Sequence, residues 1–197
     1  MNKRHAFLMA AMLLLAVSLS AQVYPVDYSV YFWPSATSPA QVEKTISNGH
    51  EIERLYAIAY NVGQTAGTHP YKLLLRAWSP GSPTVACEAT TLVKPWMGTY
   101  TMKKIAYFEA IYDFPRTKKP STVKPGRYTL MAYLTEQVPS GEAVQDTDPG
   151  NNQYPFQNEN LTVTVDVRAD AREIRCGVVS RPPWGQLPTG FKVRAHP

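Results

Sequence analysis

Oxygen-bearing side chains gather in one polar loop of this chain, which spans residues 137–155. Within it, Asp146, Asp148 and Asn151 offer carboxylate and amide oxygens of the kind that a hard cation such as Ca²⁺ prefers. The spacing lacks the EF-hand pattern and its closing glutamate. Asp, Asn and Gly also form ordinary turns, because their side chains hydrogen-bond nearby backbone amides. We therefore interpret the loop first as a structural turn, with a calcium site at these three residues as the alternative.

The two cysteines of the sequence, Cys87 and Cys176, offer redox chemistry. In an oxidising compartment an isolated pair is most simply one disulfide. Such a bond would close a loop of roughly 90 residues, which the chain-entropy model values at about 4–5 kcal/mol. Two free thiols or a disulfide-linked dimer are the alternatives. Because no histidine pair accompanies them, the two cysteines make a poor metal site.

Aromatic and basic side chains offer a third kind of chemistry, stacking on sugar rings and pairing with anions. Trp96 and Tyr100 lie in a loop segment where exposure is expected, and the basic loop 115–124 contains Lys118 and Lys119. These four residues form a candidate ligand site for a carbohydrate or an acidic partner. Two alternatives stay open: the aromatic residues belong to the core or cover a sheet edge, and the lysines form a solvated rim.

Catalytic motifs are absent from the sequence. Neither HExxH, GxSxG nor a glycine-rich phosphate loop occurs, and the histidines outside the first residues are His50, His69 and His196. We therefore expect no enzyme activity, nominate no catalytic residue, and expect no cofactor apart from the alternative calcium.

The first 21 residues resemble an export signal. A basic start at Lys3 and Arg4 precedes the 12 apolar residues 6–17 and the small residues Ser18–Ala21. The apolar run is short for a stable membrane span, although an uncleaved anchor is the alternative. We expect cleavage after Ser20 or Ala21 and a mature protein that is secreted or periplasmic.

Cleavage would leave 176 residues, enough for one domain with a good core or one domain plus a tail. Without Lys3 and Arg4, 18 of the 20 basic residues stand against 15 acidic ones, so the net charge is +3. So small a charge does not indicate a nucleic-acid partner.

Two strands with period-two alternation lie on either side of the loop 137–155, called here the acidic loop. In Gly126–Glu136, Tyr128 and Leu130 begin a buried face, and in Leu161–Val167 aliphatic residues alternate with Thr and Asp. Five further strands are predicted at residues 22–33, 52–62, 71–78, 84–93 and 101–114. The segment 52–62 is apolar on both faces, which suits a central strand, with an amphipathic helix as its rival.

Seven strands, many Gly/Pro turns and 17 prolines predict an all-β protein. The strand count and spacing fit an antiparallel β-sandwich of the immunoglobulin or fibronectin type III kind. We expect this domain to occupy residues 22–167, after the signal peptide 1–21.

The order of several short motifs resembles one bacterial family. Asn61 and Gly63 end one strand, Leu73–Trp78 form the next, Pro125-Gly126-x-Tyr128 opens another, and Asn151-Asn152 precede a Val/Thr strand. Over about residues 26–167 this order is similar to the CARDB domain, the cell-adhesion-related domain found in bacteria. The resemblance implies an immunoglobulin-like sandwich in an exported protein, a role in adhesion or assembly, and no chemistry of its own.

The remaining residues, 168–197, are predicted to form an irregular tail that is first charged and then Pro/Gly-rich. This tail is either an arm pinned to the sandwich by Cys176, with Trp184 packing on a sheet, or a segment that docks on a partner.

For the whole chain we expect an exported, non-enzymatic binding, adhesion or envelope-assembly protein. Its partner would be a protein or polysaccharide of the cell envelope, bound at a sheet edge or at end loops. A carbohydrate-binding module, and a hydrolase or inhibitor, are the alternatives.

Overall fold

The structure is a computed structural model, and it describes residues 26–35, 37–63, 65–95, 102–116, 121–154 and 162–179. These residues form an all-β sandwich of ten strands with one short 3-10 helix, η1 (Pro149–Asn152). The predicted fold class is therefore confirmed, with ten strands rather than about seven. The predicted signal peptide, Trp96, Tyr100, Lys118, Lys119 and Trp184 lie outside the described residues.

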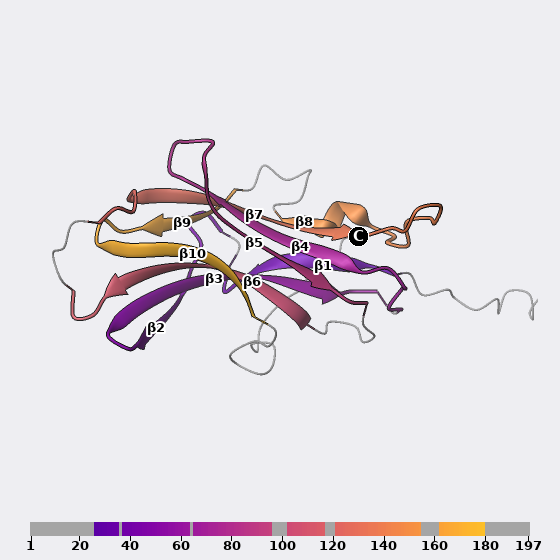
Figure 1. The fold of residues 1–197 in the computed structure, drawn as a ribbon, viewed down its shortest axis with the longest axis horizontal. Helices are drawn as coiled ribbons and strands as arrows, with labels where there is room; N and C mark the ends of the chain where they lie inside the picture. Colours follow the sequence, from indigo (N-terminus) through magenta and orange to yellow (C-terminus); the bar gives the residue numbers. More distant parts are fainter. Residues whose placement is uncertain are drawn as a thin grey trace, which may run out of the picture.

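One layer, called here the first sheet, runs in the order β1-β3-β6-β10, with β2 also paired to β3. All four pairings are antiparallel. In Figure 1 the strands β2, β3, β6 and β10 lie in the lower layer. Their bounds are β1 (Tyr28–Trp33), β2 (Glu43–Ser47), β3 (His50–Asn61), β6 (Met102–Asp113) and β10 (Ala171–Val179).

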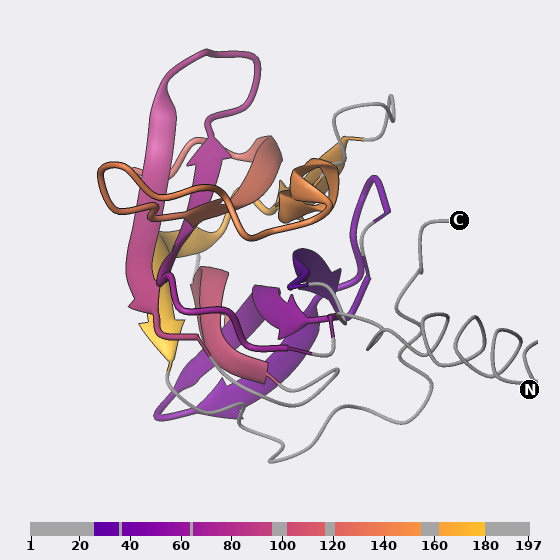
Figure 2. The ribbon, with the colours of Figure 1, turned by 90° about the vertical axis from the view of Figure 1, so that its right-hand side faces the viewer.

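The other layer, the second sheet, runs in the order β5-β4-β7-β8, with β9 also paired to β7. Figures 1 and 2 show it stacked against the first sheet. Its strands are β4 (Tyr71–Trp78), β5 (Val85–Val93), β7 (Gly126–Glu136), β8 (Gln153–Tyr154) and β9 (Val163–Val167). Within the described residues there is no helix long and apolar enough to cross a membrane.

Aromatic residues join the two sheets in the core. The rings of Tyr28 on β1 and Tyr71 on β4 have centroids 4.2 Å apart, and those of Phe108 on β6 and Tyr128 on β7 are 5.8 Å apart. All four side chains are buried. Because aromatic side chains bury large apolar areas, these pairs contribute much of the driving force that holds the layers together.

The predicted pair of strands around the acidic loop is confirmed as β7 and β9, in antiparallel register from Gly126↔Val167 to Leu130↔Val163. One detail differs from the prediction, because Thr164 is 4% exposed rather than solvated. Its hydroxyl lies 2.8 Å from that of Ser38, and its carbonyl accepts a hydrogen bond from the Ala40 amide. The segment after β1 therefore covers the edge of β9.

The sequence missed three strands, β2, β10 and the two-residue β8. The polar strand β2 pairs with β3 in a hairpin whose turn residues, Asn48 and Gly49, have positive φ angles of 50° and 75°. The prediction of an irregular segment from residue 168 is wrong for Ala171–Val179, which form β10 along β6. The strand predicted at residues 101–114 is β6, which ends at Asp113, and Phe114 after it is 46% exposed.

Candidate functional site

The predicted disulfide is present and joins the two sheets. Cys87 on β5 and Cys176 on β10 are bonded with their Cα atoms 5.4 Å apart, within the usual range. Each sheet contributes an edge strand, because β5 ends the second sheet and β10 ends the first. The bond therefore fastens one long edge of the sandwich.

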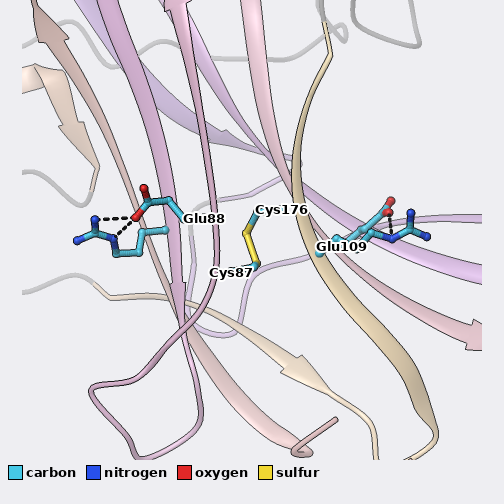
Figure 3. Close-up of a disulfide and its surroundings, with 6 residues drawn as sticks. Cys87, Glu88, Glu109 and Cys176 are labelled. Atoms are coloured by element: carbon cyan, nitrogen blue, oxygen red, sulfur yellow. Dashed lines mark hydrogen bonds and ion pairs between the residues drawn. A yellow bond between two sulfur atoms is a disulfide. The ribbon is translucent and has the colours of Figure 1, made fainter. Parts of the chain in front are cut away.

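Figure 3 shows how side chains on either side of the disulfide point away from the core. Glu88 follows Cys87 and lies on the outside of the second sheet, where it pairs with Arg76 at 2.6 Å. Glu109 lies on the outside of the first sheet and pairs with Arg54 at 2.7 Å. Glu109 is nevertheless only 3% exposed, and its carboxylate lies between the guanidinium groups of Arg54 and Arg175.

The acidic loop uses Asp146 to hold the chain together. Asp146 is 7% exposed, and its carboxylate accepts hydrogen bonds from the Tyr71 hydroxyl at 3.2 Å and the Asn152 amide at 3.0 Å. The Asp148 amide donates to it as well, at 3.1 Å. Burial raises the pKa of the Asp146 carboxyl, although these donors oppose the rise.

As a candidate calcium site, the same loop presents carboxylate oxygens that already accept protein donors. The side chain of Asn151 lies outside what the structure describes. In the described part of the chain, no three His, Cys, Asp or Glu side chains are grouped so that they could hold a metal ion. The arrangement that is visible performs the structural role expected of a turn.

Next to this loop, His69 is held between two carboxylates. Its Nδ1 lies 2.5 Å from Glu136 Oε1 and its Nε2 lies 2.7 Å from Glu142 Oε2. Hydrogen bonds to Glu142 and Glu136 raise the pKa of His69. Glu136 also accepts from the backbone amide of Gln145 at 3.0 Å. This clamp fixes the loop 137–146 to the start of β4.

The outside of the first sheet is aromatic and aliphatic. We call this surface the first outer face; it consists of Trp33, Tyr56, Ile58, Tyr60, Ile105 and Tyr107, which alternate with core residues in β1, β3 and β6. The rings of Trp33, Tyr56 and Tyr107 follow one another across neighbouring strands at 5.7 and 6.5 Å. Tyr56, Ile58, Tyr60 and Ile105 are at most 1% exposed. These residues are thus buried although they point away from the second sheet.

The outside of the second sheet is different, because its apolar side chains are partly open to solvent and lie among the polar Lys72, Glu88 and Thr90. We call this surface the second outer face; it consists of Leu74, Arg76 and Trp78 on β4, Leu92 on β5, and Met131 and Tyr133 on β7. Leu92 is 63% exposed, and the other five are exposed to an intermediate degree. The Arg76 guanidinium lies over the Trp78 ring, 5.9 Å from its centroid.

A pocket of about 290 Å³ adjoins the second outer face at Tyr133. Its apolar wall includes Val138 and Val144 from the loop that the His69 clamp holds in place, and Pro149 at the start of η1. Val144 is 61% exposed at its mouth. Tyr133 therefore belongs both to the open sheet face and to a cavity that a side chain of a partner can enter.

The sheet edges, where we expected a partner strand, are occupied at several points. The edge of β9 accepts the Ala40 amide at 2.7 Å, and the start of β1 contacts the acidic loop through a bridge between Val26 and Asp146. The β5 and β10 edges are joined by the disulfide. The contacts at β9 and Val26 leave less unpaired backbone for strand addition there. The disulfide joins side chains and does not pair the backbone of β5 or β10, so strand addition at those two edges is the alternative to docking on the open sheet face.

Sequence reasoning missed the second outer face, although a signal for it was present. Lys72 and Arg76 are the charged residues of β4 in the sequence and mark its outside, and Leu74 and Trp78 share that parity. Reading the outward residues of this strand for apolar content would have found half of the surface. The other half needed the register that sets Tyr133 opposite Leu74 and Met131 opposite Arg76.

No protein-family model matches this chain, and no curated protein sequence matches it significantly.

Proposed function

We propose that this protein is an exported, non-enzymatic binding protein, with an adhesion or envelope-assembly role, whose partner docks on the second outer face. The observation that carries the proposal is the open apolar surface on the two central strands of the second sheet, β4 and β7, extended by Leu92 on β5. Contiguous apolar surface that faces solvent is typical of interaction sites. The disulfide supports an oxidising location outside the cytoplasm.

A protein partner fits this surface better than a sugar does. Protein interfaces are enriched in Trp, Tyr, Met and Arg, and Trp78, Tyr133 and Met131 provide three of these around Arg76. Sugar rings stack on aromatic faces but gain little from aliphatic side chains such as Leu74 and Leu92. The pocket beside Tyr133 has apolar walls, which suits an apolar side chain of the partner.

The experiment is a pull-down with the disulfide-intact mature chain as bait against envelope extract from the source organism, with bound proteins and sugars both identified. The test variant is Leu92→Asp, which places a charge on the second outer face. The matched control is Ile46→Asp, because Ile46 on β2 is 62% exposed, close to the 63% of Leu92, but lies on the first sheet.

We expect Leu92→Asp to weaken capture of a specific protein by about tenfold or more, equivalent to ~1.4 kcal/mol, and Ile46→Asp to leave it unchanged. Equal capture by both variants would refute the second outer face as the binding surface. Recovery of sugars without proteins would instead favour the carbohydrate-binding alternative.

A further inference from the structure

His69 contacts a carboxylate with each of its ring nitrogens, and the two contacts together require a particular protonation state. Nδ1 lies 2.5 Å from Glu136 Oε1 and Nε2 lies 2.7 Å from Glu142 Oε2. An ionised carboxylate only accepts hydrogen bonds, whereas a neutral imidazole carries a proton on one nitrogen only. Both contacts can therefore be hydrogen bonds at the same time only when the ring is protonated.

The two carboxylates differ in how firmly the rest of the chain holds them. The side chain of Glu136 is 6% exposed and also accepts the backbone amides of Gln145 and Asp146, at 3.0 and 3.1 Å. The side chain of Glu142 is 54% exposed, and among the described residues its carboxylate pairs with His69 alone. Loss of one ring proton should therefore keep the contact with Glu136 and break the contact with Glu142.

Gln145 offers the neutral ring another partner. Its Oε1 accepts the backbone amide of Thr68 at 2.8 Å, which identifies the other end of the side-chain amide as Nε2. This nitrogen lies 3.4 Å from His69 Nε2. An amide N–H can donate to an unprotonated ring nitrogen but not to a protonated one. His69 Nε2 thus has two alternative partners, Glu142 for the charged ring and Gln145 for the neutral ring.

The base of the loop 137–146 does not depend on the charge of the ring. At one end the Gln137 amide donates to the Pro70 carbonyl at 2.8 Å. At the other end the Gln145 amide donates to Glu136 at 3.0 Å. Neither bond involves the imidazole, so the base stays fixed in both protonation states.

The tip of the loop, residues 138–144, depends on the contact with Glu142. Within the described chain, this contact is the one hydrogen bond or ion pair that joins the tip to another part of the protein. The tip carries Val138 and Val144, which form part of the apolar wall of the pocket beside Tyr133. The protonation of one buried ring is thereby connected to the shape of the pocket.

The charges around His69 favour the same two states. In the described residues, the ion pairs of Glu136 and Glu142 are made with His69 alone, while the nearby Asp146 and Tyr71 bind one another. A neutral ring leaves the two carboxylates without a cation between them, so their repulsion favours movement of the exposed one. Hydrogen bonds to both carboxylates raise the pKa of His69 above its ordinary value of about 6.5.

We propose that His69 is a pH-dependent switch that regulates partner docking on the second outer face. With a charged ring, Glu142 holds the loop tip in place, and Val138 and Val144 complete the pocket wall. With a neutral ring, Nε2 accepts from Gln145, Glu142 turns to solvent and the tip moves away. The effect on docking rests on the proposed function, whereas the movement of the loop does not.

The test is a pH titration of the disulfide-intact protein, labelled with ¹³C and ¹⁵N, by NMR. The ring ¹⁵N shifts of His69 report whether one or both nitrogens carry a proton, and the methyl signals of Val138 and Val144 report the position of the loop tip. We expect all of these signals to change with one midpoint. Valine signals that do not follow the titration of His69 would overturn the switch.

Two variants at the exposed Glu142 separate the two states. In Glu142→Gln, the amide can accept from a charged ring through its oxygen and donate to a neutral ring through its nitrogen, so the tip should stay in place at every pH. Glu142→Ala removes the contact, so its valine signals should match those of the parent at high pH throughout the titration. Valine signals in Glu142→Ala that titrate as in the parent would overturn the switch as well.

The pull-down with envelope extract, repeated below and above the midpoint, tests the regulation of docking. Capture by the parent should fall above the midpoint by about fivefold or more, the lower end of typical coupling between two sites. Capture by Glu142→Gln should not change with pH, and capture by Glu142→Ala should be weak on both sides. Constant capture by the parent, despite movement of the valine signals, would overturn the regulation.

Failure of the proposed function gives a different result. In that case no protein is captured, or capture is the same for the parent and Leu92→Asp at every pH. The regulation of docking is then overturned with the proposed function, whereas the NMR titration still decides whether His69 controls the loop tip.

Discussion

The two outer faces of this sandwich follow the same pleat but meet different surroundings. On the first sheet, the outward Ile58 is 0% exposed; on the second sheet, the outward Leu92 is 63% exposed. Charged residues differ in the same way, since Glu109 on the first face is 3% exposed, whereas Glu88 on the second has a side chain that is 40% exposed.

This difference teaches that the parity of a strand residue does not by itself decide burial. Both faces are rich in apolar side chains, yet only the first is covered. An apolar surface that is covered contributes to stability, whereas one left open is available for binding. The two faces should therefore respond to substitution in opposite ways, the first through folding and the second through partner affinity.

The largest effect is expected from removing the disulfide that joins the two regions. The Cys87→Ala/Cys176→Ala variant should lose about 4–5 kcal/mol of unfolding free energy by the loop-entropy model, for a bond that closes a sequence separation of 89 residues. Urea titration measures the loss. A midpoint equal to that of the parent protein would show that the bond does not hold the sheets together.

The comparison itself is sharpened by the same truncation on both faces. Ile58→Ala should destabilise the protein by about 2–5 kcal/mol, because it leaves a cavity in a covered surface. Leu92→Ala should change stability by no more than about 0.5 kcal/mol, because the side chain is mostly solvated. Equal costs in urea titrations of the two variants would mean that the faces do not differ.

A smaller effect is expected at Gly177 on β10. An added Cβ there would overlap the Tyr107 ring, which lies over this glycine on the first outer face. Because the end of the ring can shift, Gly177→Ala should cost about 1 kcal/mol, measured by urea titration. The Gly177→Ala/Tyr107→Leu double variant provides the control: if the ring is the obstacle, the two substitutions will be less costly together than their sum.

The smallest effect is a pH dependence at the end of the second face, where the His69 clamp holds the pocket loop. The folded pKa of His69 is raised by Glu142 and Glu136. Its contribution is therefore fully present below the unfolded pKa of about 6.5 and is lost as pH rises through the higher folded pKa. Stability measured from about pH 6 upward should fall in this window in the parent and not in His69→Gln. An identical slope in both proteins would exclude the clamp.

Much of the fold could be predicted because most of its strands show a clear pattern of apolar residues in the sequence. Alternation in residues 126–136 and 161–167 predicted the β7–β9 pair, and Tyr71–Trp78 was found with its bounds. The missed strands lack that signal: β2 has four polar residues beside the exposed Ile46, β8 has only two residues, and β10 carries Arg172, Glu173 and Arg175 in its first half. All three are stabilised by pairing with a neighbour, which sequence periodicity does not reveal.

The candidate surface could be predicted only in part. The apolar character of both sides of residues 52–62 was visible, but which side faced the core was not, because the adjacent Glu53 and Arg54 place one charged residue on each side. Cross-strand register, which unites Leu74 with Tyr133, is a tertiary property. Similarly, Asp146 is a possible metal ligand by residue type alone. In the structure its carboxylate accepts hydrogen bonds from Tyr71 and Asn152.

The most direct test of the difference between the two outer faces is hydroxyl-radical footprinting of the disulfide-intact protein, with each oxidation rate normalised to that of the urea-unfolded chain. The account predicts that Trp78 and Met131 on the second outer face are oxidised at a large fraction of their unfolded rates, whereas Tyr56 and Tyr60 on the first are strongly protected. Comparable protection of the two sets would contradict the assignment of one covered and one open face.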